Sequence, residues 1–400
     1  MEQAAGTGGE RTYTLEQVLS AALQGQQAIA VWRLPLQTEV QAYVSFAPHL
    51  TSAITELESS PAGFLFCPFV TEGMHDHIFL KADIRYSSLT RQLSYAPDAP
   101  ATQVDLFTET LTQIETGKPA AWPIPAKPAR HADRNEETFK AAVSLAVDVI
   151  RAETMEKVVL SRINTTPLPE GFSLLKAFEK MQSAYPNAFV SLVAIPGVGT
   201  WLGASPEILV SMDQQQVFKT VALAGTQPAC EDGSTANAIW REKEIEEQGM
   251  VERYVLSCFK KLRLREYTEV GPRTVTAGNL MHLRTDFKVD LKEVDFPTLG
   301  TDMLRLLHPT SAVCGLPKEP ALRFILDHEG YDRSYYSGFL GPVNSNVGTH
   351  LFVNLRCMQL WQHEAVLYAG AGITGDSSSE KEWQETQHKL QTMGKILAEF

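Results

Sequence analysis

From residue 157 onward the chain is dominated by short apolar segments rich in β-branched and aromatic residues, a composition typical of strands. The eight segments are KVVLSRI, AFVSLVAI, TWLGAS, EILVSM, QVFKTVAL, TVTAGNLMHL, HLFVNLRCMQL and AVLYAGAGIT. Helical patterns interrupt them only near residues 174–183, 239–262, 321–326 and 380–399. Because helices and strands do not alternate regularly, we expect an α+β sheet architecture and not a doubly wound parallel sheet.

The first 130 residues show a looser pattern of short elements. We expect a helix at 14–24 and strands at 27–33, at 63–69 and after residue 77. The segment PAAWPIPAKP at 119–128 has four prolines in ten residues, which predicts a linker or a surface crossing. A regular helical periodicity then runs from 139 to 153.

Charge and cysteine usage exclude several classes of protein. The net charge of −12 and the absence of a basic stripe argue against a nucleic-acid partner. Five scattered cysteines without CxxC spacing predict reduced thiols in a cytoplasmic protein. The first residues lack the basic start and apolar core of a signal peptide, and no apolar run reaches the roughly 18 residues of a membrane span.

Two glutamate pairs carry the first chemical signal. Glu244 and Glu247 lie in one predicted helix, and Glu382 and Glu385 lie in another. The i, i+3 spacing puts both carboxylates of each pair on one helix face. The same faces continue with apolar residues, which are Val251, Tyr254, Val255 and Cys258 in the first helix and Met393 and Ile396 in the second.

This alignment leaves two interpretations of the glutamates open. They are either solvated charges beside Lys243 and Lys381, or inward carboxylates that need a cation, because an unpaired buried charge is costly. A cation site built only from oxygen ligands suits Mg2+ better than a soft metal.

A lysine and a second glutamate are candidates for proton transfer. Lys157 opens the strand KVVLSR and is either a surface lysine with a buried stem or a desolvated amine that accepts a proton. Glu207 follows the small-residue turn GASP and precedes an apolar strand. It is either a charge at a turn or a carboxylic acid whose pKa is raised by apolar surroundings.

Further candidates suit an anionic ligand. Arg356 interrupts an otherwise apolar strand and needs a carboxylate partner, either structural or from a substrate. Lys389 either pairs with Glu385 or supplies a second cation. The glycine-containing turns at 369–374 and 224–227 allow backbone N–H groups to approach an anion, and a lone histidine such as His282 is usually a satisfied core residue.

Taken together, these residues indicate a Mg2+-assisted site for a small polyanion, with a lysine base and a glutamate acid. The corresponding reaction class is proton-coupled addition to, or elimination from, a carboxylate-bearing substrate.

The ordered motifs of the chain resemble those of the chorismate-utilising enzymes. This family includes isochorismate synthases, salicylate synthases and the large subunits of anthranilate and aminodeoxychorismate synthases. The matching blocks run from about residue 157 to 393, with a looser match upstream. They are KVVLSR, GASPEILV, LAGTQP, EKEIEEQGMV, GNLMHL, LHPTSAVCGLPKEPALRFI, YYSGFLGPV, VNLRCMQL, YAGAGIT and EKEWQETQHKLQTM.

The resemblance implies a fold and a ligand. The fold is like that of anthranilate synthase component I: one α+β unit over residues 1–400, with large antiparallel sheets stacked face to face and flanked by helices. Residues 1–130 would form its looser N-terminal part and residues 140–396 its chorismate-binding part. The substrate would be chorismate, a dicarboxylate whose ring carboxylate is held by Mg2+.

The resemblance also assigns roles to individual residues. Glu247 and Glu382 match the metal-binding glutamates, with Glu244 and Glu385 in support. The pyruvyl carboxylate of the substrate would be held by Tyr336, Arg356 and Lys389 together with the backbone at Gly370 and Gly372. Further positions that line the substrate are matched by Gly225, Thr226 and His282.

Within the family, Lys157 distinguishes between nucleophiles, since relatives that add ammonia carry glutamine at this position. The resemblance therefore implies that Lys157 activates water to attack C2 of the ring. Glu207 would protonate the departing C4 hydroxyl, so that isochorismate forms reversibly. No glutaminase subunit is then expected, and a monomer is reasonable.

Three alternatives remain. A salicylate synthase shares both residues and goes on to eliminate pyruvate. Ala312 occupies a position where isochorismate synthases have alanine and lyase-competent relatives have threonine, whereas Tyr336 and Leu355 fit both patterns. An amine-transferring subunit is disfavoured by Lys157, and a non-catalytic chorismate-binding module is disfavoured because Lys157, Glu207, Glu247 and Glu382 are all retained.

Overall fold

A computed structural model describes residues 11–51, 54–70, 75–114, 117, 120–125, 135–229, 235, 238–277 and 280–400. The expectation about a signal peptide concerns residues 1–17, of which residues 1–10 lie outside the described residues. Part of the proline-rich segment also lies outside them, and its described residues 120–125 contain no helix or strand.

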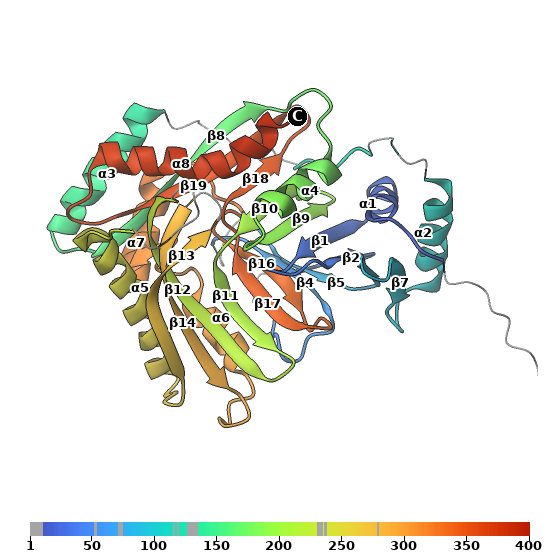
Figure 1. The fold of residues 1–400 in the computed structure, drawn as a ribbon, viewed down its shortest axis with the longest axis horizontal. Coiled ribbons are helices and arrows are strands. Elements are labelled where there is room, and N and C mark those ends of the chain that lie inside the picture. The colour runs from blue at the N-terminus through green and yellow to red at the C-terminus, as the bar shows by residue number, and fades with distance from the viewer. Residues whose placement is uncertain are drawn as a thin grey trace, which may run out of the picture.

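Two large antiparallel sheets form the body of the molecule (Figure 1). The ten-stranded sheet has the spatial order β15 (Gly315–Leu316), β8 (Lys157–Pro167), β19 (Glu364–Ile373), β18 (Cys357–Leu360), β10 (Gly199–Ser205), β9 (Phe189–Ile195), β1 (Ala28–Arg33), β2 (Val40–Ser45), β6 (Ile84–Ser87) and β7 (Gln92–Tyr95). The nine-stranded sheet has the order β13 (Thr268–Ala277), β14 (Leu280–Asp290), β12 (Val217–Pro228), β11 (Ile208–Asp213), β17 (Gly348–Val353), β16 (Phe339–Val343), β4 (Gly63–Cys67), β5 (His77–Lys81) and β3 (His49–Thr51). Antiparallel pairing throughout these strands confirms the α+β prediction.

Helices cover the outer faces of both sheets (Figure 1). The ten-stranded sheet carries α1 (Leu15–Gln24), α2 (Ala101–Gln113), α4 (Leu174–Ala184) and α8 (Ser379–Ala398), which share one apolar core with it. The nine-stranded sheet carries α5 (Glu242–Lys261) and α6 (Leu299–Leu307), while α3 (Glu136–Arg151) and α7 (Lys318–His328) pack near β8. A third apolar core, rich in aromatic rings such as Trp32, Phe66 and Trp201, fills the space between the sheets.

Local sequence signals explain several of these elements. The helix expected at 14–24 begins after Thr14, whose hydroxyl accepts a hydrogen bond from the backbone N–H of Gln17 at 3.2 Å. The side chain of Gln17 accepts in return from the N–H of Thr14 at 2.8 Å, which completes a capping box. Helices α2 and α6 were not predicted, although Leu299, Met303 and Leu307 in α6 have the i, i+4 spacing of a buried helix face.

The prediction of one continuous strand through HLFVNLRCMQL is wrong, because the chain changes sheets within it. Strand β17 belongs to the nine-stranded sheet and β18 to the ten-stranded sheet. Arg356 lies at this crossover with φ +47°. The chain makes a second crossover between β10 and β11, at Glu207, and the two crossovers are hydrogen-bonded to each other. The N–H of Ala204 donates to the carbonyl of Arg356, and the N–H of Val353 donates to the carbonyl of Glu207, both at 3.0 Å.

Strands from both parts of the predicted unit enter each sheet. The N-terminal part contributes β1, β2, β6 and β7 to one sheet and β3, β4 and β5 to the other. In the part of the chain that the structure describes, no helix has both the length and the apolar character needed to cross a bilayer.

Candidate active site

A partly enclosed cavity is lined by residues of both crossovers, by the glycine-rich end of β19 and by α5 and α8. The predicted site residues that line it are Glu207, Gly225, Thr226, Glu247, His282, Ala312, Tyr336, Leu355, Arg356, Gly370, Gly372 and Lys389. Glu244, Glu382 and Glu385 line an adjoining cavity, which shares Thr226 with the first. The structure therefore brings residues from distant parts of the sequence to one place.

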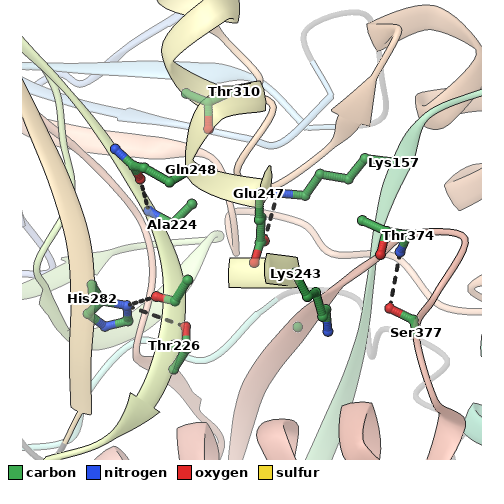
Figure 2. Close-up of polar contacts among 12 residues, drawn as sticks. Lys157, Ala224, Thr226, Lys243, Glu247, Gln248, His282, Thr310, Thr374 and Ser377 are labelled. Carbon is green, nitrogen blue, oxygen red and sulfur yellow. Dashed lines mark hydrogen bonds and ion pairs between the residues drawn. The ribbon is translucent and has the colours of Figure 1, made fainter. Parts of the chain in front are cut away.

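Lys157 is buried and paired with a carboxylate. Its side chain is 0% exposed, and its Nζ donates to Oε1 of Glu247 at 2.7 Å (Figure 2). Burial by itself raises the pKa of Glu247, but the ammonium groups of Lys157 and then Lys243 bring it down to about 2. Of the two interpretations of Lys157, the structure excludes the exposed surface lysine. Because its Nζ donates to the Glu247 carboxylate, Lys157 can act as a base only after this contact is released.

Glu207 lies buried at the crossover between β10 and β11. Burial raises its pKa to about 7, although Lys157, the Thr310 hydroxyl and Arg356 each act in the opposite direction. The Thr310 hydroxyl donates to Oε1 of Glu207 at 3.4 Å. A carboxyl group with this pKa carries a proton in a large fraction of molecules at neutral pH, as a general acid must.

Two positively charged side chains, Lys389 and Arg356, form a suitable binding place for a carboxylate ligand. Lys389 on α8 donates to the carbonyl of Gly370 at 2.8 Å and to Glu385 at 2.6 Å. Nη1 of Arg356 is buried and has no hydrogen-bond partner among the described residues. A buried guanidinium N–H without a partner is suited to an incoming carboxylate.

His282 is a neutral hydrogen-bonding group beside a bulge in β12. The bulge lies between Ala224 and Gln227, with Gly225 at φ +63°. Nδ1 of His282 lies 2.9 Å from the Gly225 carbonyl and 3.3 Å from the Thr226 hydroxyl (Figure 2). Burial, with a further contribution from Arg356, lowers the pKa of His282 to about 3. Nδ1 therefore donates to the carbonyl, and Nε2, which has no partner among the described residues, remains as an acceptor.

One member of each glutamate pair lies largely out of solvent, Glu382 fully and Glu247 mostly, whereas Glu244 and Glu385 are partly exposed. Glu382 is 1% exposed, its Oε1 accepts from the ammonium of Lys243, and burial followed by the charge of Glu385 raises its pKa to about 7. Its Oε2 makes no hydrogen bond of normal geometry within the described ranges, although the Ser377 hydroxyl is close enough to lower this pKa. Glu244 accepts from the backbone N–H of Arg241 at 2.9 Å and so caps its own helix.

The carboxylate oxygens at this place are ligands of the kind that Mg2+ prefers. The ammonium of Lys243 lies in the field of Glu382, Glu385 and Glu247, which together raise its pKa against the effect of burial. Three carboxylates thus already surround one positive charge, and one of them has an unpartnered oxygen. Among the described residues no three metal-binding side chains are gathered at a single point, so a cation would take the place of an ion pair with lysine.

Sequence reasoning missed a residue that holds two walls of the cavity together. Gln248 follows Glu247 on α5, and its Oε1 accepts from the N–H of Ala224 at 3.0 Å (Figure 2). Its amide also donates to the carbonyl of Ala222 at 3.3 Å and to the Thr285 hydroxyl at 3.1 Å. The sequence signal that could have identified Gln248 is its place directly after Glu247, on a helix that packs against a sheet.

Comparison with known proteins gives one family for nearly the whole chain. A family model described as "Chorismate binding enzyme" matches residues 8–398. The vibriobactin-specific isochorismate synthase of Vibrio cholerae is 28% identical over 264 residues, which cover 64% of this chain and 66% of the relative. The chain thus aligns with about two thirds of the length of that relative.

Solved structures show the same fold. MenF, the menaquinone-specific isochorismate synthase of Escherichia coli, superposes with a TM-score of 0.76 at 20% identity over 97% of this chain and 92% of its own. Anthranilate synthase component I of Streptococcus pneumoniae has a TM-score of 0.62 at 20% identity, with 98% and 95% covered. The predicted architecture of stacked antiparallel sheets, like that of anthranilate synthase component I, is confirmed.

Proposed function

The chain belongs to the family of chorismate binding enzymes, and we propose that it is an isochorismate synthase. The reaction is the reversible, Mg2+-dependent isomerisation of chorismate, in which water adds at C2 and the C4 hydroxyl leaves. The observation that carries this proposal is a fully buried lysine, Lys157, whose charge acts on a second buried group, the carboxyl group of Glu207, which has a pKa of about 7. We also propose a cytoplasmic monomer that needs no glutaminase subunit.

The two groups supply the proton transfers that the reaction requires. Lys157 accepts a proton from water as the water oxygen bonds to C2. The two ring double bonds then shift by one position, and the bond between C4 and its hydroxyl oxygen breaks. Glu207 gives its proton to that oxygen, which leaves as water. In the reverse direction the ammonium of Lys157 is the acid and the carboxylate of Glu207 is the base.

The remaining residues hold the substrate. Arg356 and Lys389 would bind the carboxylate of the pyruvyl side chain beside the backbone of Gly370 and Gly372. Mg2+, held by Glu247 and Glu382 with Glu244 and Glu385 in support, would neutralise the ring carboxylate. Lys157 would act as the base once its contact with Glu247 is released.

Replacement of Lys243 is expected to tighten Mg2+ binding. Its ammonium is paired with Glu382, so a cation that uses this carboxylate must displace it. The Lys243→Met variant is expected to bind Mg2+ about tenfold more tightly than the wild type, a difference of about 1.4 kcal/mol. Isothermal titration of the protein with Mg2+ alone measures the effect. Lys381→Met, which removes an exposed lysine from the same cavity rim, should change the affinity little. Unchanged or weaker binding in Lys243→Met would contradict the displacement.

Addition of one methyl group at Gly372 is expected to disable the site. A Cβ atom there would lie 2.5 Å from Oε1 of Glu247 and 3.1 Å from Cε of Lys157. Displacement of catalytic groups by about 1 Å costs on the order of a hundredfold in rate. Gly372→Ala should therefore lower kcat by roughly that factor with an unchanged circular dichroism spectrum. Gly394→Ala is the control, because its Cβ meets no atom within 4 Å. Equal rates in the two variants would show that Gly372 is not needed for close approach.

Salicylate synthase is the second candidate, because it shares Lys157 and Glu207 and also fits Tyr336 and Leu355. Ala312, which lines the cavity, favours the first candidate. Chromatography of the products from chorismate and Mg2+ separates the candidates. Isochorismate alone is expected, whereas salicylate with pyruvate would identify the second. An aminated product that forms only with ammonium would overturn the role of Lys157, and binding without turnover would indicate a non-catalytic module.

A further inference from the structure

We infer that a buried ion pair outside the predicted site, Glu329 with Arg333, positions the strand that carries the catalytic base and the turn that carries Ala312. The inference deepens the proposed function and rests on it for the meaning of the rate measurements. Neither residue was singled out by the sequence, and neither lines the cavity. Their contacts, however, reach three of its walls.

The pair supplies hydrogen-bond partners to β8 at the edge of its sheet, where β15 is too short to do so. Strand β15 pairs with β8 only at Lys157 and Val158, after which the N–H of Val159 donates to the Cys314 carbonyl at 2.8 Å. Beyond that point side chains take the place of a neighbouring strand. Nη2 of Arg333 donates to the Val159 carbonyl at 2.7 Å, and Oε1 of Glu329 accepts from the N–H of Ser161 at 2.5 Å. The free backbone groups of an edge strand are thereby satisfied.

The two side chains form a rigid fork. Nε of Arg333 donates to Oε2 of Glu329 at 2.6 Å, and Nη2 donates to Oε1 at 2.8 Å. Their side chains are 2% and 1% exposed. Burial alone lowers the pKa of Arg333, but Glu329 more than offsets this and raises it above its usual value. The guanidinium is thus permanently charged, and its planar geometry fixes the directions of its donors.

The same guanidinium contacts the walls of the cavity. Nη1 of Arg333 donates to the carbonyl of Val313 at 2.8 Å. Val313 is the residue that directly follows Ala312. The group also lies over the ring of Tyr336, 5.9 Å from its centroid. Val159, Val313 and Tyr336 all line the cavity, and Lys157 lies two residues before Val159. One residue therefore links the strand of the base, the turn of Ala312 and the ring of Tyr336.

Lysine in place of Arg333 keeps the charge but cannot make these contacts together, since an ammonium is a compact donor without a fork. Arg333→Lys is expected to lower kcat about a hundredfold, because the position of Lys157 affects the chemical step. The KM for chorismate should stay within about threefold, because Arg356 and Lys389 are untouched. A split of this kind distinguishes positioning from a general loss of folded protein.

Arg33→Lys is a matched control. Arg33 in β1 is 4% exposed and also donates to backbone carbonyls, among them those of Tyr185, Pro186 and Ala188 at 2.7, 2.8 and 3.1 Å. It is not among the residues that line the cavity. Both variants should have a lower Tm, and only Arg333→Lys should lose kcat. Parallel losses of kcat and Tm in both, or normal kcat in Arg333→Lys, would overturn the inference.

Hydrogen exchange gives a readout that does not depend on the proposed reaction. In Arg333→Lys the amides of residues 157–163 and 311–316 should exchange faster than in the wild type, while Arg33→Lys should leave them unchanged. Unchanged protection in both segments would refute the positioning role even if the protein proved to have another activity. Faster exchange in a protein that makes no isochorismate would instead show that the positioning role is right and the proposed function is wrong.

Discussion

Lys157→Ala is expected to lower isochorismate formation by about a thousandfold while chorismate binding remains measurable. General base catalysis contributes roughly a hundredfold to ten-thousandfold, and no other lysine occupies the end of β8. Binding persists because the groups proposed to hold the substrate carboxylates, Arg356 and Lys389, are separate from Lys157. The loss should therefore fall on kcat, which is measured by product chromatography, with binding measured by titration calorimetry.

The matched control is Lys260→Ala, which removes an exposed lysine from α5. It should turn over like the wild type. Normal turnover in Lys157→Ala would show that the assignment of the base is wrong, whereas loss of binding together with turnover would move Lys157 from the chemical step to the binding of substrate.

Glu207→Gln should have the second largest effect, because the amide cannot give a proton to the departing hydroxyl. A loss of about a hundredfold or more in the forward rate is expected. The wild-type profile follows from the pKa of about 7. The forward reaction uses the protonated form, so kcat/KM should fall as pH rises above about 7. The reverse reaction uses the carboxylate, so its rate should rise as pH increases toward the same value.

The stability of this variant gives an independent check. The pKa of Glu207 is higher in the folded protein than in the unfolded chain, so the folded state binds the proton more tightly. Stability from this group is present at low pH and is lost as pH rises from about 4.5 toward about 7. Glu207→Gln should thus have a higher Tm than the wild type at pH 8, and the exposed control Glu246→Gln should not. A flat rate profile with an unchanged Tm would remove Glu207 from the role of acid.

Patterns that lie within one element were predictable from the sequence. The i, i+3 glutamates with an apolar continuation placed Glu247 and Glu382 on inward helix faces, and Val251 and Met393 are buried as that reasoning required. The periodicity of α3 and the capping residues of α1 likewise give local evidence for each helix. Such signals depend on neighbours a few residues away, so a short stretch of sequence contains all the residues that define them.

Features that depend on distant contacts were not predictable from pattern. The two crossovers between the sheets, at Glu207 and Arg356, follow from the pairing of β17 with β11 and of β18 with β10. The sequence of a single strand does not encode which strand it pairs with. The ion pair between Lys157 and Glu247 joins residues 90 positions apart. Arg333 reaches Val159 across 174 positions, and it lies between α7 and β16, where no local pattern predicts this contact.

The most direct test of the account is the fate of the oxygen at C2 when chorismate is converted in water labelled with heavy oxygen. The proposed roles of Lys157 and Glu207 require solvent oxygen at C2 and release of the original C4 oxygen. Mass spectrometry should therefore find one labelled oxygen in isochorismate formed by the wild type with Mg2+, and about a thousandfold less of this labelled product with Lys157→Ala. Unlabelled isochorismate from the wild type would contradict water addition at this site.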